Sequence, residues 1–169
     1  MRDRTGLSGG FKFFAHDSEH TLLTDDLNQN RIGPFAAGDP LIQGGAAFGR
    51  SSPGYLFSRL SGNAEFRLRV ADRAQKYFFN GGLFTPQALR ARFLVRSNEI
   101  YRAIVPESAR WGDSKQAAPR TRNADWVPEM NRIYGTYHSQ RPNIGLSQLR
   151  AKSLYPAISA PVFNKFGGI

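Results

Sequence analysis

The sequence predicts a mainly α-helical fold, with one or a few short strands near the N-terminus and a long irregular loop before the helices. Helices are indicated by apolar residues that recur every three or four positions from residue 63 onward, the spacing of one helix face. The loop is indicated by residues 24–54, which are rich in Gly, Pro, Asn and Asp and follow neither a helical nor a strand period. We therefore expect a single partial domain. It divides into a strand segment (1–23), a loop (24–54), a helical lobe (55–155) and an extended tail (156–169).

The composition favours one domain with a hydrophobic core and a basic surface. The 169 residues are 40% hydrophobic and include no cysteine, which excludes disulfides, thiolate metal sites and cysteine nucleophiles. Lysine and arginine outnumber aspartate and glutamate 23 to 13, a net charge of +10 that favours anionic partners. Because no RNA- or DNA-binding signature accompanies these cations, we expect a solvated basic helix surface rather than nucleic-acid recognition. No stretch reaches the ~20 apolar residues of a membrane span, and the first ten residues lack the apolar core of a signal peptide.

Residues 10–15 predict a short strand, with Phe11 and Phe13 on one side and Lys12 on the other. A lone strand leaves its own backbone N–H and C=O groups without partners. We therefore expect this chain to be a fragment of a larger domain. The loop that follows, 24–54, has the length of a functional loop.

The remainder predicts four helices. Asn63 caps the first, which closes at 80–82 where glycine permits a left-handed turn. The second begins at Thr85-Pro86 and is ended or kinked by Pro106, Asn123 caps the third, and the fourth runs from about Pro142 to Lys152. The apolar spacing predicts which side chains of the first three helices face inward. In the first helix they are Phe66, Val70, Ala74, Tyr77 and Phe78, and in the second they are Leu89, Phe93, Ser97, Ile100, Tyr101 and Ile104. In the third they are Trp126, Val127, Met130, Ile133, Tyr134 and Tyr137.

An acidic and histidine-rich cluster, His16-Asp17-Ser18-Glu19-His20, follows the predicted strand. His16, Glu19 and His20 match the H-x-x-E-H pattern of inverted zinc peptidases, in which two histidines bind zinc and the glutamate is the general base. That chemistry needs both histidines on one face of a continuous helix, whereas here a strand precedes the first and a loop follows the second. The sequence therefore disfavours a zinc site.

Two other interpretations of the same cluster remain open. In one, Asp17 holds a divalent cation just past the end of the strand and Glu19 supplies a second carboxylate, since hard oxygen ligands suit Mg²⁺. In the other, Asp17 or Ser18 starts a turn or caps a short helix and binds nothing.

For the other polar residues considered, a structural role is favoured over a catalytic or binding role. Glu107, Arg110 and Asp113, with Trp111 between them, form either a polar cluster facing a cleft or a salt-bridged helix end, and we favour the second. His138 follows a tyrosine-rich helix, and we expect it on the surface.

Several phrases carry a resemblance to a known family. They are FKFFAHDSEHTL, EFRLRVADRAQKYFFNGGLFTPQAL, IVPESARWGD, TRNADWVPEM and LRAKSLYPAISAPVF. Together they resemble the C-terminal part of the CotH-type family of atypical protein kinases, named for a spore-coat protein. The resemblance covers nearly the whole chain, and its most specific phrases are ADRAQKYFFNGG (71–82) and ESARWGD (107–113).

The resemblance implies the helical C-terminal lobe of a protein-kinase-like α+β fold. It also implies ATP and Mg²⁺ as cofactors and a protein as substrate. Asp17 resembles the metal-binding Asp of the kinase DFG position, with Ser18-Glu19 in place of Phe-Gly, and Glu19 is the candidate second ligand. The nucleotide-binding lobe, its phosphate-anchoring lysine and the catalytic-loop Asp have no counterpart before the strand, where Asp3 is the only acid. We therefore expect this chain alone to be inactive.

A non-catalytic alternative is a binding or cell-envelope module that uses the basic helical surface for adhesion or assembly. The resemblance implies a cell-envelope, secreted or spore-coat setting for the full-length parent, whereas the residues themselves indicate no compartment. The phosphoacceptor is not indicated by the sequence either.

Overall fold

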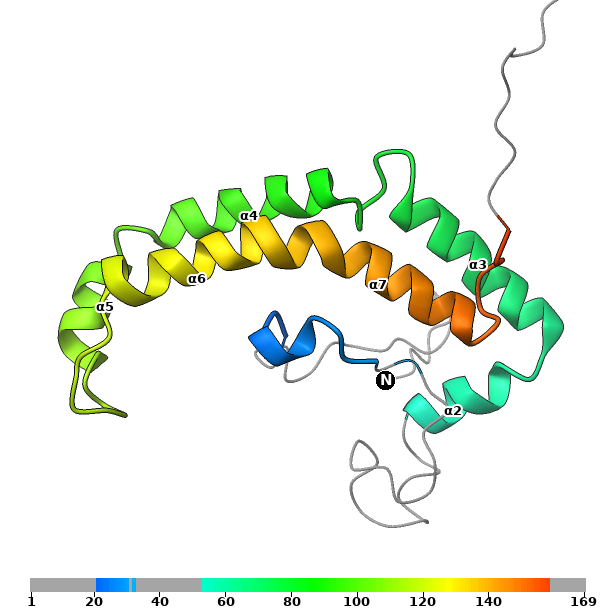
Figure 1. The fold of residues 1–169 in the computed structure, drawn as a ribbon, viewed down its shortest axis with the longest axis horizontal. Coiled ribbons are helices and arrows are strands. Elements are labelled where there is room, and N and C mark those ends of the chain that lie inside the picture. Colours follow the sequence, from blue (N-terminus) through cyan, green and yellow to red (C-terminus); the bar gives the residue numbers. More distant parts are fainter. Residues whose placement is uncertain (1–20, 31, 33–52, 159–169) are drawn as a thin grey trace, which may run out of the picture.

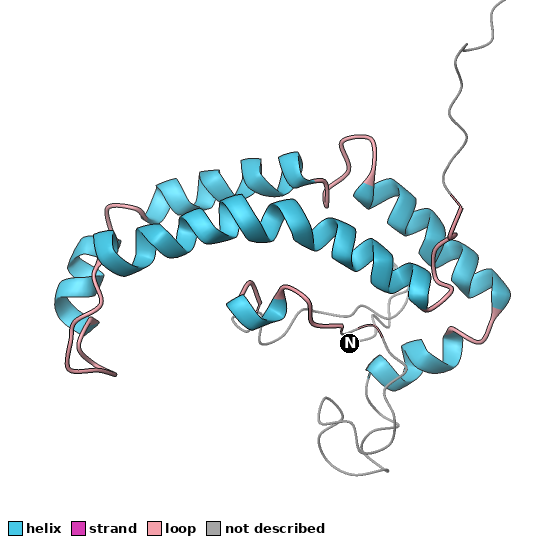
Figure 2. Ribbon diagram, viewed as in Figure 1, coloured by secondary structure: helices cyan, strands magenta, loops and turns pink. Residues whose placement is uncertain are grey.

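The computed structural model describes residues 21–30, 32 and 53–158, and this part of the chain is helical, with no strand (Figures 1 and 2). The predicted mainly α fold is confirmed for these residues. The predicted strand at 10–15 lies outside them. The elements are η2 (Thr24–Asp26), α2 (Pro53–Leu60), α3 (Ala64–Phe78), α4 (Pro86–Ile100), α5 (Ile104–Trp111), η3 (Arg122–Trp126), α6 (Val127–Arg132), η4 (Ile133–Tyr137) and α7 (His138–Ala151).

One long bowed helix organises the structure. The elements α6, η4 and α7 follow one another without a break, and α4 lies alongside them. Helix α3 packs against α7, whereas α5 packs against η3 at the opposite end (Figure 1). Residues 21–30 lie under the concave side of the bowed helix. No helix of the described residues is long and apolar enough to cross a membrane.

The starts of α3 and α4 agree with the sequence. The Asn63 side chain accepts a hydrogen bond from the Phe66 N–H at 3.0 Å, and the Thr85 hydroxyl accepts one from the Ala88 N–H at 3.4 Å. Both caps satisfy an N–H that has no partner inside its own helix. The closing turn of α3 contains Gly81 with φ +76°, a conformation that glycine adopts without steric cost. Both predicted caps and the predicted glycine closure are therefore confirmed.

The predicted third and fourth helices are wrong in their boundaries. Thr121, not Asn123, caps the third, because its hydroxyl accepts a hydrogen bond from the Ala124 N–H at 3.1 Å. The fourth does not begin at Pro142, which lies buried inside α7. A proline in a helix interior loses one backbone hydrogen bond. Here burial of the ring, together with the buried His138 and Leu146 of the same helix, offsets that loss.

The second helix also ends differently from its prediction. Helix α4 stops at Ile100, before Pro106, and the proline sits in the first turn of α5, where a missing N–H is harmless. Ile100 is 47% exposed and Tyr101 is 41% exposed, so the predicted buried stripe does not continue past Ser97. The predicted loop, 24–54, is wrong at both ends, because η2 occupies Thr24–Asp26 and α2 begins at Pro53.

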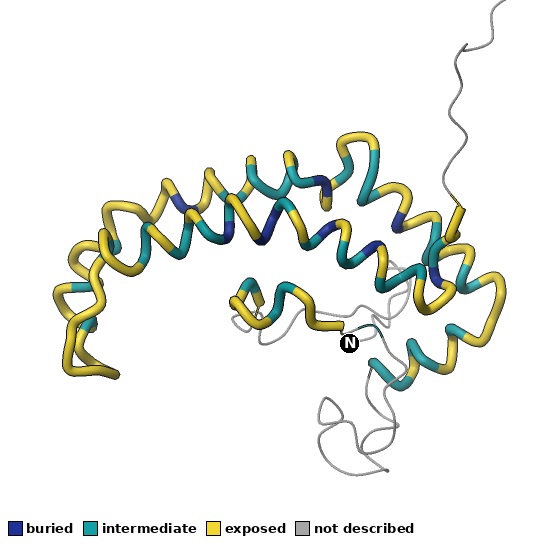
Figure 3. Tube along the Cα trace, viewed as in Figure 1, coloured by how far each residue is buried: buried dark blue, intermediate teal, exposed yellow. Residues whose placement is uncertain are grey.

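The core is a narrow seam rather than a thick layer (Figure 3). The buried apolar residues are Ala74, Ile133, Tyr137, Leu146 and Leu154. They come from α3, η4, α7 and the segment after α7, so the seam runs along the bowed helix. The predicted inward faces of the first and third helices are buried or half-buried, as expected.

Candidate functional site

The two residues predicted to hold a metal ion, Asp17 and Glu19, lie outside the described residues. The described part of the chain contains no group of three or more His, Cys, Asp or Glu side chains that could hold a metal. A carboxylate pair such as Asp17 and Glu19 has the oxygen donors that Mg²⁺ prefers. In sequence, the described residues begin at residue 21, two positions after Glu19.

Residues 21–30 are held on the long helix through their backbone carbonyl groups. Arg132 donates a hydrogen bond to the Leu22 carbonyl at 2.5 Å. Arg141 donates one to the Leu27 carbonyl at 3.1 Å, and Gln148 donates one to the Asn28 carbonyl at 3.0 Å. The donors lie on α6 and α7 and repeat along the helix, so the segment follows the helix axis. Its position depends on donors more than a hundred residues away in sequence.

Leu22 adopts an uncommon backbone conformation at the start of this segment. Its φ is +68°, in the left-handed region that non-glycine residues rarely occupy. Arg132, which binds the Leu22 carbonyl, is itself oriented by two hydrogen bonds to the Glu129 carboxylate, at 2.7 and 2.6 Å. The hydrogen bond from Arg132 lowers the pKa of Glu129, so the pair stays charged at neutral pH. Backbone strain of this kind concentrates at functional sites, where surrounding contacts maintain it.

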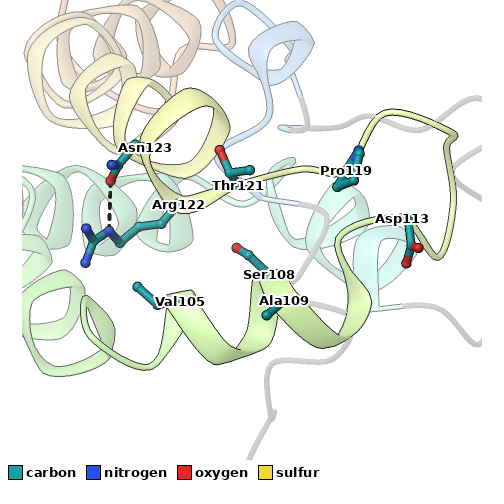
Figure 4. A pocket seen from close by; sticks show the side chains of 8 residues that line it. All are labelled: Val105, Ser108, Ala109, Asp113, Pro119, Thr121, Arg122 and Asn123. Atoms are coloured by element: carbon teal, nitrogen blue, oxygen red, sulfur yellow. Dashed lines mark hydrogen bonds between the residues drawn. The ribbon is translucent and has the colours of Figure 1, made fainter.

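A cavity lies between α5 and the chain that leads into η3 (Figure 4). It has a volume of about 620 Å³ and is lined by Val105, Ser108, Ala109, Asp113, Pro119, Thr121, Arg122 and Asn123. Arg122 donates a hydrogen bond to the Asn123 side chain at 2.9 Å, and its guanidinium lies 4.5 Å from the centre of the Tyr101 ring. These contacts hold Arg122 against neighbouring protein groups, and its hydrogen bond to Asn123 is drawn in Figure 4.

The predicted salt-bridged end of α5 is not observed in the described part of the chain. Glu107, Arg110 and Asp113 make no ion pair there, and Arg110 instead stacks on Trp111 at 4.9 Å from the ring centre. Of the three, only Asp113 is among the described residues that line the cavity, so a polar cluster of all three facing it is not observed either. The short helix α5 leaves these side chains in solvent, where an ion pair gains little free energy.

The prediction that His138 lies on the surface is wrong, because this residue is buried. Only 5% of the residue is exposed, and its ring packs edge-on against Phe93 at 5.0 Å. Burial lowers the pKa of His138, and the positive charge of Arg90 lowers it further, so the imidazole is neutral at pH 7. The sequence did contain a signal, since His138 lies four positions after Tyr134 on the predicted inward face.

Arg90 links α4 to a widened turn of the long helix. Within η4 the His138 N–H donates to the carbonyl five residues back, as in a π-helix. Arg90 donates hydrogen bonds to the carbonyls of Tyr134 at 2.8 Å and Gly135 at 3.1 Å, and its guanidinium lies over the Tyr134 ring. Such a widened turn is often found at functional sites. Here it brings His138 and Arg90 to the same seam.

Comparison with known proteins gives no further assignment: no protein-family model, no characterised protein and no solved structure matches this chain. The site is therefore described by its own residues alone.

Proposed function

We propose that this chain forms the C-terminal helical part of a CotH-type protein kinase domain. In this proposal Asp17 binds the Mg²⁺ ion that accompanies ATP, and Glu19 is a second ligand. Asp17 and Glu19 would hold the ion through their carboxylate oxygens, and the ion would supply positive charge that offsets the charge of the ATP phosphates. The role of the chain's own residues is to orient Asp17 and to hold the loop that follows it.

The observation that carries the proposal is the anchoring of the segment that begins four residues after Asp17. Arg132 and Arg141 hold the backbone of Leu22 and Leu27 on the long helix. A metal-binding carboxylate must keep its position to within a fraction of an ångström. A strained residue fixed by a charged side chain supplies such a constraint at Leu22.

Two of the sequence phrases that resemble the family lie at the C-terminal ends of helices. ADRAQKYFFNGG ends α3 and forms its closing turn, and a Cβ on Gly82 would lie 2.3 Å from the Lys76 carbonyl oxygen. LRAKSLYP ends α7 and contains Leu154, which is 1% exposed. Both phrases therefore fix how α3 and α7 end, which is a structural reason for their composition.

The test uses the protein translated from the complete reading frame and measures Mg²⁺-dependent ATP turnover. We expect Asp17→Ala to lower the turnover by at least about 100-fold, because the charge of the metal stabilises the transferring phosphoryl group by several kcal/mol. Asp25→Ala is the matched control, since Asp25 is an exposed carboxylate in the same part of the chain. Unchanged turnover in Asp17→Ala contradicts the metal role.

A second candidate is a non-catalytic module that binds an anionic partner through its basic surface. Only three ion pairs join the described residues, namely Arg69–Glu65, Arg96–Glu99 and Arg132–Glu129. Most basic side chains of the described residues lie outside these pairs, and ion pairs do not change the chain's net charge of +10, which would attract an anionic partner. Absence of ATP turnover in the complete protein, together with salt-sensitive binding to a polyanion, would favour this candidate.

A further inference from the structure

A second cavity lies on the seam between α3, α4 and α7 and has a volume of about 300 Å³. Most of its lining is apolar, including the side chains of Phe78, Phe84, Leu89 and Leu149. A cavity of half this volume is known to hold benzene, so about 300 Å³ accommodates an apolar body of roughly two rings. The cavity is of the size and character of a small-molecule site.

His138 lies in the wall of this cavity. Only 5% of the residue is exposed. Its Nδ1 has no hydrogen-bond partner among the described residues, and almost none of the surface of this atom is accessible, so Nδ1 does not face the cavity. His138 therefore contributes a buried ring to the wall rather than a polar contact for a ligand.

Arg141 gives the cavity a positive charge. Its guanidinium has five N–H donors. It donates to the Leu27 carbonyl at 3.1 Å and to the Gln148 side chain at 3.1 Å, so other N–H donors have no partner among the described residues. The described lining residues include Arg141 and His138 but no carboxylate. A cation beside an apolar chamber favours a molecule with one anionic end and an apolar body.

We propose that this cavity binds a small monocarboxylate with an apolar body of about two rings. The carboxylate accepts hydrogen bonds from the Arg141 guanidinium, and the apolar body fills the chamber beside Phe78 and Leu89. The site uses neither Asp17 nor Glu19, so it is independent of the proposed phosphoryl transfer.

Gly145 offers a way to fill the cavity without disturbing the helix. A Cβ built at Gly145 lies 3.6 and 3.7 Å from ring carbons of Phe78, which is ordinary van der Waals contact. Gly145→Leu therefore places a side chain in the chamber, and the replacement of glycine favours the helix. Gly135→Leu is the matched control on the same long helix, because a Cβ at Gly135 meets nothing within 4 Å.

The experiment titrates the full chain with naphthalene-2-carboxylate and follows binding by calorimetry. We expect saturable binding that Gly145→Leu weakens at least tenfold and Gly135→Leu leaves within twofold. Naphthalene-2-carboxamide, which lacks the charge, should bind at least tenfold more weakly than the carboxylate. No binding at millimolar concentration, equal loss in both variants, or equal binding of the amide would each overturn the proposal.

A second measurement does not depend on any variant folding. In the wild-type protein with labelled methyl groups, naphthalene-2-carboxylate should shift the NMR signals of Leu89 and Leu149, which line the cavity. The signals of Leu94, an exposed residue on α4, should not move. Shifts at Leu94 equal to those at Leu89 indicate surface adsorption and contradict a site in the cavity.

Discussion

Replacing Arg90 with methionine tests whether this side chain clamps α4 onto the long helix. Arg90→Met removes two charge-assisted hydrogen bonds, to the carbonyls of Tyr134 and Gly135, and a cation–π contact with the Tyr134 ring. Hydrogen bonds from a charged donor contribute about 1.5–3 kcal/mol each when buried. The bond to Tyr134 is partly buried, whereas the bond to Gly135 is exposed and contributes less. We therefore expect a loss of about 2 to 3 kcal/mol in the free energy of unfolding.

The assay is urea unfolding of the full chain, followed by the helical circular dichroism signal. Methionine has nearly the helix propensity of arginine, so the change in stability reports the lost contacts. Arg73→Met is the control, because Arg73 is exposed on α3 and has no hydrogen bond or ion pair in the described residues. A loss below about 0.5 kcal/mol in Arg90→Met, or a loss equal to that of Arg73→Met, would refute the clamp.

Three further predictions concern the closing turn of α3 and the buried histidine. Gly82→Ala should destabilise the chain by about 2 kcal/mol or more, measured by the same unfolding assay, because its Cβ would lie 2.3 Å from the Lys76 carbonyl oxygen and 2.6 Å from that of Tyr77. Since the pKa of His138 is lowered in the folded chain, the unfolded chain binds the proton more tightly, so the free energy of unfolding should fall as pH drops below about 6.5. Arg90→Met should raise the pKa of His138 in an NMR titration, because the positive charge that opposes protonation is gone.

A control for the Gly82→Ala prediction and a control for the acid sensitivity of His138 separate the effect of each residue from other effects. Gly135→Ala adds a Cβ in open space and should not destabilise the chain, with a gain of up to about 1 kcal/mol from helix propensity, so a loss equal to that of Gly82→Ala would contradict the packing argument. His138→Leu should lose the part of the acid sensitivity due to this ring, whereas His16 and His20 contribute equally to both proteins. An identical pH profile in His138→Leu would contradict the assignment.

Local chemistry in the sequence was sufficient to predict several elements. Asn63 and Thr85 cap α3 and α4 as expected, because each satisfies backbone N–H groups within three residues of itself. The inward face of the third helix was also predicted correctly, since its apolar spacing repeats over several turns. The same pattern could have placed His138 on this face, but its polar side chain suggested the surface.

The long-range contacts were decided only by the tertiary structure. Pro142 lies inside a helix because packing on the seam offsets its missing hydrogen bond, and no local signal reports such packing. Arg132 and Arg141 hold the segment after Asp17 from more than a hundred residues away, although by sequence each is one basic residue among 23. The sequence determined which side chains could cap, turn or bind, because those preferences act over a few residues. Tertiary structure determined which of them meet, since that depends on how the helices pack.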